Sequence, residues 1–214
     1  MNVLCLYNIP SPYRVQFCNE LSGHVSLDVI YERKKASDRN KKWESSASTA
    51  YNIIYLEGIK IGAEQALSFN IIKFLRKNTY DIIVIGGYST PTSMLAIIYM
   101  KLKKIPFLLN ADGAFIKPDS RLKRFIKRFF IKSARAWLST SDNTSRYFEH
   151  YGAKNERIYK YPFSSIMQTD IKEKRPTESE KKRMKSDLGI DENKIILSIG
   201  QFIERKGFDV LLKS

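Results

Sequence analysis

Short apolar runs alternate with longer amphipathic segments over the first 160 residues or so. Runs of strand type occur at 2–7, 25–31, 52–56, 81–86, 105–111 and 136–140. Apolar positions recur with helical spacing at 13–21, 63–76, 90–103 and 142–152. The run at 81–86 is apolar without alternation, as in a strand buried on both faces. This order predicts an α/β fold, with an open, Rossmann-like parallel sheet covered by helices on both faces.

The pattern changes after residue 163. Residues 164–193 are charged and weakly apolar, with a short helical stretch that we expect Thr177 or Ser179 to cap. The strand pattern then restarts in "IILSIG". We therefore predict a domain over 1–163, a linker over 164–193, and the first strand, loop and helix start of a truncated second domain over 194–214.

Composition limits the classes of function. A hydrophobic content of 43% is enough for a buried core, and no apolar run approaches the ~20 residues of a membrane-spanning helix. The N-terminus reads as a strand rather than a signal peptide, so we expect a cytoplasmic location. Only two cysteines and two histidines are present, which argues against a metal site. We expect Cys5 and Cys18 to be core thiols.

The net charge of +15 calls for an anionic partner or surface. Nucleic acid, an anionic membrane face and a phosphorylated small molecule are the three candidates. We expect no nucleic acid as a partner, because neither an RNP-like nor a helix-turn-helix signature is present and the cations are spread over several segments.

The last residues, "LSIGQFIERKGFDVLLKS", place Arg205 and Lys206 between Gly200 and Gly207 in a strand-to-helix turn. A glycine at the end of a parallel strand lets a ligand approach the backbone, and a helix start favours phosphate. Arg205 can bind phosphate oxygens in a forked geometry, and Lys206 adds a point charge. Such a pair can stabilise a departing diphosphate without a metal ion. The alternative is that both are ordinary solvated cations.

Ligands of open α/β sheets bind beyond the carboxyl ends of the strands. That rule selects a set of residues in three loops: Ser11, Tyr13, Arg14, Gly87, Tyr88, Asp112 and Gly113. Arg14 pairs either with a phosphate of an acceptor or with a neighbouring carboxylate. Asp112 is either a polar contact or base for the ligand, or the cap of a local turn. The glycines are also ordinary turn formers.

A basic amphipathic segment occupies 120–138, "SRLKRFIKRFFIKSARAWL". Its apolar residues recur at helical spacing between arginines and lysines. Such a helix either lies on an anionic membrane surface, with its cations at the headgroups, or packs its apolar face on the sheet and leaves its cations in solvent.

The C-terminal block resembles the opening of the second domain of family 4 glycosyltransferases, which have the GT-B fold. The positions that match are Gly200, Arg205, Lys206, Gly207, Phe208, Asp209 and Leu211. "NIPSPYRVQFCNEL" at 8–21 and "STSDNTSRYFEHYGAKNERIYKYPF" at 139–163 are similar to first-domain segments of that family, the former in a subgroup acting on bacterial surface polysaccharides.

The resemblance implies a retaining enzyme that transfers a sugar from a nucleotide-sugar donor to a lipid-linked saccharide in surface polysaccharide or lipopolysaccharide synthesis. Arg205 and Lys206 would hold the donor diphosphate beside Gly200, with no cofactor or metal. Ser11, Tyr13, Arg14, Gly87, Tyr88 and Gly113 would lie on the acceptor side. The enzyme would be cytoplasmic or peripheral on the inner face of the plasma membrane.

Two departures from the family pattern matter. Asp112 precedes Gly113 where many members have a histidine, so a catalytic role for Asp112 does not follow from the resemblance. The family's Glu-x7-Glu pattern of the donor pocket is absent from these 214 residues. We therefore expect the chain to be inactive alone. The alternative functions are a non-catalytic acceptor- or membrane-binding domain and a basic nucleic-acid-binding protein.

Overall fold

The computed structural model describes residues 1–34, 50–61, 65–76, 79–164, 166, 168–192, 194–200 and 202–213. The chain divides into two compact units, Met1–Ile166 and Met167–Ser214. The predicted site residues of the three strand-end loops belong to the first unit. The predicted phosphate loop belongs to the second.

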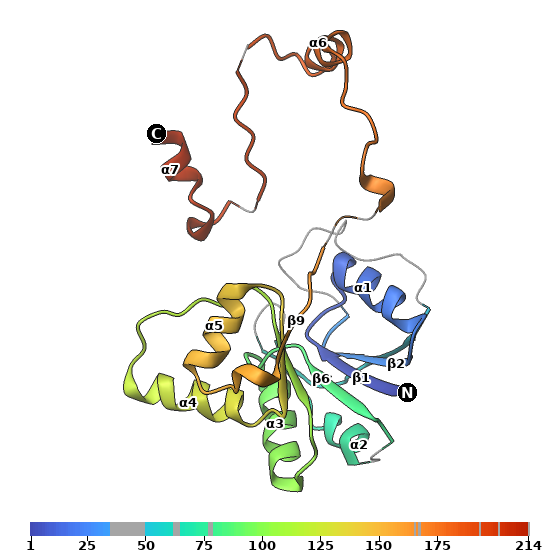
Figure 1. Ribbon diagram of the computed structural model, residues 1–214, viewed down its shortest axis with the longest axis vertical. Coiled ribbons are helices and arrows are strands. Elements are labelled where there is room, and N and C mark those ends of the chain that lie inside the picture. Colours follow the sequence, from blue (N-terminus) through green and yellow to red (C-terminus); the bar gives the residue numbers. More distant parts are fainter. Residues whose placement is uncertain are drawn as a thin grey trace. The chain divides into compact units, whose positions relative to one another are not determined.

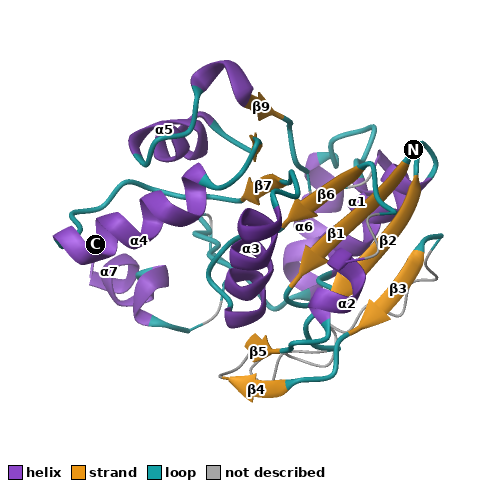
Figure 2. Cartoon of the chain, turned by 90° about the horizontal axis from the view of Figure 1, so that it is seen from below, coloured by secondary structure: helices purple, strands orange, loops and turns teal. Residues whose placement is uncertain are grey.

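A parallel sheet forms the centre of the first unit (Figure 2). Within the described residues it has seven strands, in the order β3-β2-β1-β6-β7-β8-β9, and every pair is parallel. The strands are β1 Asn2–Tyr7, β2 Ser26–Tyr31, β3 Asn52–Tyr55, β6 Ile82–Ile85, β7 Leu108–Ala111, β8 Ala136–Ser139 and β9 Ile158–Lys160. The predicted α/β, Rossmann-like sheet is thereby confirmed. Its strand order reverses between β1 and β6, the kind of position where such sheets bind ligands.

Helices cover both faces of this sheet (Figure 1). Four of them supply the core on one face, and α1 packs on the other. They are α1 Pro12–Ser22, α2 Ile71–Arg76, α3 Pro91–Lys103, α4 Arg121–Lys132 and α5 Asp142–His150, with a short 3-10 helix, η2, at Asn155–Arg157. The Thr90 side chain caps α3 by accepting a hydrogen bond from the Ser93 N–H, as expected for a threonine before a helix.

Both cysteines lie in the core beneath α1. Cys5 is in β1 and Cys18 in α1, and each is a buried free thiol, as predicted. Burial raises the pKa of each thiol to about 12, because an apolar environment disfavours the thiolate. Neither thiol is therefore suited to act as a nucleophile near neutral pH.

One predicted helix is partly a hairpin. The sequence predicts a helix over 63–76, but Gln65–Leu67 forms strand β5, antiparallel to β4 at Ile59–Ile61, and only α2 is helical. The cause is tertiary. Thr92 donates to the Ala66 carbonyl at 2.6 Å and accepts from the Ser68 N–H at 3.0 Å, so the start of α3 holds this backbone extended.

The second unit is held mainly by local structure. Its elements are η3 Gln168–Asp170, α6 Glu178–Asp187, η4 Glu204–Lys206 and α7 Phe208–Lys213. Thr177 caps α6 in a reciprocal capping box with Glu180, which confirms one of the two predicted caps. Residues 194–200, predicted as a strand, have none assigned, and Ile196, Leu197 and Ile199 are exposed. A strand requires a pairing partner, and the described part of this unit offers none.

Candidate functional site

Arg14 and Asp112 meet at the carboxyl edge of the sheet. Arg14 lies in the first turn of α1, after β1, and Asp112 directly follows β7. The Nη2 group of Arg14 donates to Oδ2 of Asp112 and forms an ion pair. The two side chains differ in exposure, 6% for Arg14 and 41% for Asp112. The carboxylate therefore remains open to a ligand, while the guanidinium is enclosed.

Aromatic rings enclose that guanidinium. Its central carbon lies 4.7 Å from the ring centre of Tyr7, 4.9 Å from that of Phe163 and 5.7 Å from that of Phe17. At such distances a cation is attracted to the ring faces. The Nη1 atom is buried and has no hydrogen-bond partner in the described part of the chain. Aromatic rings and the Asp112 carboxylate thus hold the guanidinium in place.

The charge of Arg14 is secure in this environment. Burial disfavours the cation, but the neighbouring oxygens of Tyr7 and Asp112 outweigh burial and raise the pKa of Arg14 above its usual value. A permanent positive charge therefore stands behind Asp112.

The start of α1 positions Arg14. Ser11 is the buried N-cap residue with extended backbone, and its carbonyl accepts from the Arg14 N–H at 2.9 Å. Its side chain makes no capping hydrogen bond within the described structure. Tyr13 packs edge-on against Phe163, with ring centres 5.6 Å apart. Ser11 and Tyr13 thus lie beside the Arg14–Asp112 pair, which the sequence grouped with them only by position after a strand.

The predicted glycines leave open space at the strand ends. Gly87 has φ +127° and Gly113 has φ +68°, and a Cβ added to either would meet nothing within 4 Å. Positive φ values at both positions explain why glycine is present. Gly86 differs, because a Cβ there would lie 2.2 Å from Cδ1 of Tyr7. The open side of Gly113, next to Asp112, is accessible to a ligand.

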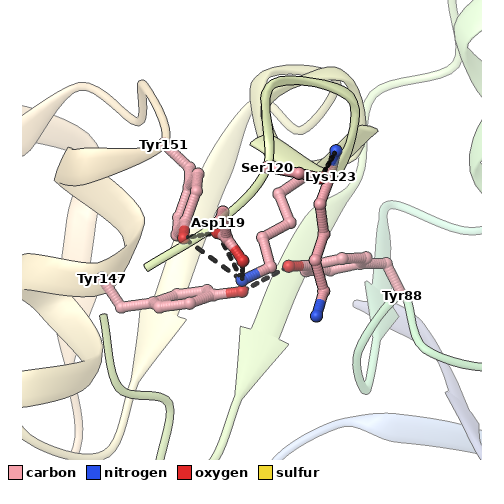
Figure 3. Close-up of polar contacts among 7 residues, drawn as sticks. Tyr88, Asp119, Ser120, Lys123, Tyr147 and Tyr151 are labelled. Atoms are coloured by element: carbon pink, nitrogen blue, oxygen red, sulfur yellow. Dashed lines mark hydrogen bonds and ion pairs between the residues drawn. The ribbon is translucent and has the colours of Figure 1, made fainter. Parts of the chain in front are cut away.

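Tyr88 belongs to a second polar cluster, shown in Figure 3. Its hydroxyl shares a hydrogen bond with that of Tyr147, and its ring stacks on Phe130 at 5.7 Å. Nearby, Asp119 accepts two hydrogen bonds from Lys127, at 2.8 and 3.0 Å, and one from Tyr151. The hydrogen bonds from Lys127 and Tyr151 lower the pKa of Asp119. This cluster ties the loop after β7 to α4 and α5.

A buried carboxylate lies at the end of β2. Glu32 accepts hydrogen bonds from the hydroxyls of Thr90 and Ser93, the latter at 3.1 Å, and from the Ala66 N–H at 3.4 Å. Burial raises the pKa of Glu32, and these hydrogen bonds only partly offset the effect. Through these hydrogen bonds Glu32 connects the end of β2 to the start of α3 and to strand β5 of the β4–β5 hairpin.

The predicted donor-side residues belong to the second unit. Lys206 ends η4 and is exposed, Gly207 follows with φ +65°, and α7 begins directly after it. A Cβ at Gly200 would make ordinary contact, 3.6 Å, with the Phe208 ring, so packing within this unit does not require glycine there. The side chain of Arg205 lies outside the described structure. In the described ranges no cluster of three or more potential metal ligands is found.

Sequence reasoning missed the residues that surround Arg14. Tyr7 ends β1, and Tyr161 and Phe163 follow β9, so the rule that selected the other loops applies to them as well. Glu32 follows β2 in the same way. The available signal was a polar or aromatic side chain directly after a strand. The sequence does not show that the end of β1, the loop after β7 and the segment after β9 meet at one arginine.

Comparison with solved structures identifies the class of fold. No protein-family model matches the sequence, and no curated protein matches it. Anabaena HepE in complex with UDP and glucose matches with a TM-score of 0.57 and 13% identity, over 88% of this chain and 50% of that chain. HepE in complex with UDP-glucose gives 0.55 and 13% over the same shares. A UDP-N-acetylglucosamine 2-epimerase from Rickettsia bellii gives 0.47 and 14%, over 75% and 44%.

The two HepE matches show a shared fold. The chain spans about half the length of the structures that it resembles. At 13% identity, the likeness to HepE establishes the Rossmann-like α/β architecture of the chain. Among the described helices, none is both long and apolar enough to cross a lipid bilayer.

Proposed function

We propose that the chain is part of a retaining family 4 glycosyltransferase with the GT-B fold, with the first unit on the acceptor side. The enzyme transfers a sugar from a nucleotide-sugar donor to a lipid-linked saccharide in bacterial surface polysaccharide or lipopolysaccharide synthesis. It works in the cytoplasm, at the inner face of the membrane. HepE, which shares this fold, has been solved in complex with UDP-glucose and with UDP and glucose, and this supports nucleotide-sugar chemistry on the fold.

The observation that carries this proposal is the Arg14–Asp112 pair at the carboxyl edge of the sheet. Asp112 presents a half-exposed carboxylate beside the open backbone of Gly113. A carboxylate in this position accepts hydrogen bonds from the hydroxyls of a saccharide. Arg14 pairs with that carboxylate and orients it. Ser11, Tyr13 and Gly87 border the same acceptor region, whereas Tyr88 acts through its contacts with α4 and α5.

On the donor side, Arg205 and Lys206 neutralise the diphosphate as the bond to the sugar breaks. Gly200 and Gly207 permit the approach of that group to the backbone. The charge that develops on the leaving diphosphate is thereby stabilised where it forms, which accelerates the transfer. In the proposed reaction the nucleotide sugar is the donor substrate, and neither a cofactor nor a metal ion is required.

The test is a transfer assay on the polypeptide extended through the reading frame beyond codon 214. We expect turnover of a nucleotide sugar, and Arg205→Ala should lower kcat by about a hundredfold or more. Lys213→Ala, which removes an exposed cation from the same segment, is the matched control and should retain activity. Full activity of Arg205→Ala, or equal losses in both variants, would contradict the proposal.

A further inference from the structure

The first half of α4 presents an apolar surface to solvent. Leu122 and Phe125 are 70% and 68% exposed, and Ile126 is 40% exposed. Their spacing places them on one face of the helix. Phe115 and Ile116, in the loop that leads into α4, are also exposed, at 59% and 49%. Exposed large side chains gathered in this way mark an interaction surface.

The second half of the same helix packs inward. Phe130 and Ile131 are buried, and Phe130 stacks on Tyr88. Figure 1 shows α4 at the margin of the first unit, with its first turns farthest from the sheet. Of the two alternatives for residues 120–138, packing of the apolar face on the sheet therefore holds for only part of the helix. Its C-terminal half belongs to the core, and its N-terminal half is left uncovered.

The exposed turns are held in place. Ser120 caps α4 by accepting from the Lys123 N–H at 3.3 Å. One turn further on, Lys127 bonds to both Asp119 and Tyr151, and so fixes the middle of the helix to the preceding loop and to the end of α5. The apolar surface is therefore presented on an ordered support.

The charges around this surface have one sign. Arg121, Lys123, Arg124 and Arg128 are exposed on α4, and within the described residues none of them forms an ion pair. The helix contains no acidic residue, and the adjoining Asp119 is neutralised by Lys127. An amphipathic helix with a cationic polar face matches the boundary of an anionic lipid leaflet, where cations meet the headgroups and apolar side chains enter the acyl region.

We propose that this surface, formed by Phe115, Ile116 and the first half of α4, docks the first unit on an anionic lipid bilayer. The inference rests on the proposed function for its purpose, because a lipid-linked acceptor lies in that same bilayer. Binding itself requires neither donor nor turnover.

The test is co-sedimentation of the 214-residue chain with vesicles of phosphatidylcholine, alone or mixed with phosphatidylglycerol. We expect binding to the mixed vesicles only, weakening as salt is added. The double variant Leu122→Ser/Phe125→Ser should bind about tenfold more weakly or worse, because two large apolar side chains no longer leave water. The control, Ile59→Ser/Phe69→Ser, changes two equally exposed residues elsewhere on this unit and should bind as before.

A second pair of variants tests the charge. Arg121→Gln/Arg124→Gln should weaken binding by about fivefold per cation removed. Lys103→Gln/Lys154→Gln lowers the net charge equally at exposed sites outside this surface and should have little effect. Equal losses in the two charge pairs would overturn the proposal, as would equal binding to both kinds of vesicle.

A competing occupant is a second copy of the chain. Light scattering that shows a dimer, converted to a monomer by Leu122→Ser/Phe125→Ser, would assign the surface to self-association and overturn docking on lipid. The vesicle-binding test and the test of the proposed transferase function can fail independently of each other. Lack of vesicle binding in an active extended enzyme refutes the docking surface alone, whereas vesicle binding without any sugar transfer refutes the proposed function alone.

Discussion

Arg14 and Asp112 lie 98 residues apart in the sequence and form an ion pair at the end of β1 and β7. The pair is asymmetric, since the guanidinium is enclosed by aromatic rings and the carboxylate is partly in solvent. In this arrangement Arg14 acts as a fixed support, and Asp112 is the group that a ligand can reach.

We predict that Asp112→Asn lowers the free energy of unfolding by about 2 kcal/mol, because Arg14 is left buried without a counter-charge. The loss is smaller than for a fully buried pair, since water screens part of the interaction at Asp112. Urea denaturation measures it. The double variant Arg14→Met/Asp112→Asn should recover part of the loss, because no uncompensated charge remains. An unchanged urea midpoint in Asp112→Asn would contradict the importance of the pair.

Glu32 makes a pH-dependent contribution to stability. Burial raises its pKa above the ordinary 4.5, so between 4.5 and the raised value the folded chain binds more protons than the unfolded chain. Stability from this group is therefore greatest below about pH 4.5 and falls as pH rises through the window above it. Glu32→Gln removes the effect.

The measurement for Glu32 is the difference in unfolding free energy between the natural chain and Glu32→Gln, taken near pH 4.5 and again near neutral pH. The difference cancels the contributions of other titrating groups. We expect it to shift in favour of the variant as pH rises. A difference that is constant, or that shifts toward the natural chain, would show that the pKa of Glu32 is not raised.

The strand-end glycines should differ in their tolerance of alanine. Gly113→Ala should cost about 1 kcal/mol, because an L-residue is strained at φ +68° although space is available. Gly86→Ala should cost more, because its Cβ would lie 2.2 Å from the Tyr7 ring, which in turn contacts Arg14. Gly23→Ala, at φ −66°, is the control and should be close to neutral. Thermal unfolding of the three variants ranks them, and a reversed order of the first two would contradict the packing at Tyr7.

Much of the first unit could be predicted from the sequence. Buried parallel strands require continuous apolar runs, and such runs marked β1, β2 and β6 within a residue or so of their observed bounds. The hairpin of β4 and β5 could not be predicted, because hydrogen bonds from Thr92 override a local helical pattern. The strand predicted over 194–200 depended on a partner that the described part of the second unit does not contain.

The candidate site, too, could be predicted only in part from the sequence. The sequence placed Arg14, Asp112 and Gly113 at strand ends, because the order of elements determines which residues follow each strand. It could not choose between a phosphate and a carboxylate as the partner of Arg14, nor foresee the enclosure of Arg14 by Tyr7 and Phe163. That choice depends on which strands are neighbours in the sheet.

By itself, the sequence determined the order of strands β1, β2, β3, β6, β7 and β8, a cap of α6 at Thr177 or Ser179, and the buried state of both thiols. These depend on local patterns of apolar and polar residues. Only the tertiary structure decided that Arg14 pairs with Asp112 and that α4 buries Phe130 while leaving Phe125 exposed. The physical reason is that distant segments must pack together before a charge acquires its partner or one end of an apolar stripe is covered.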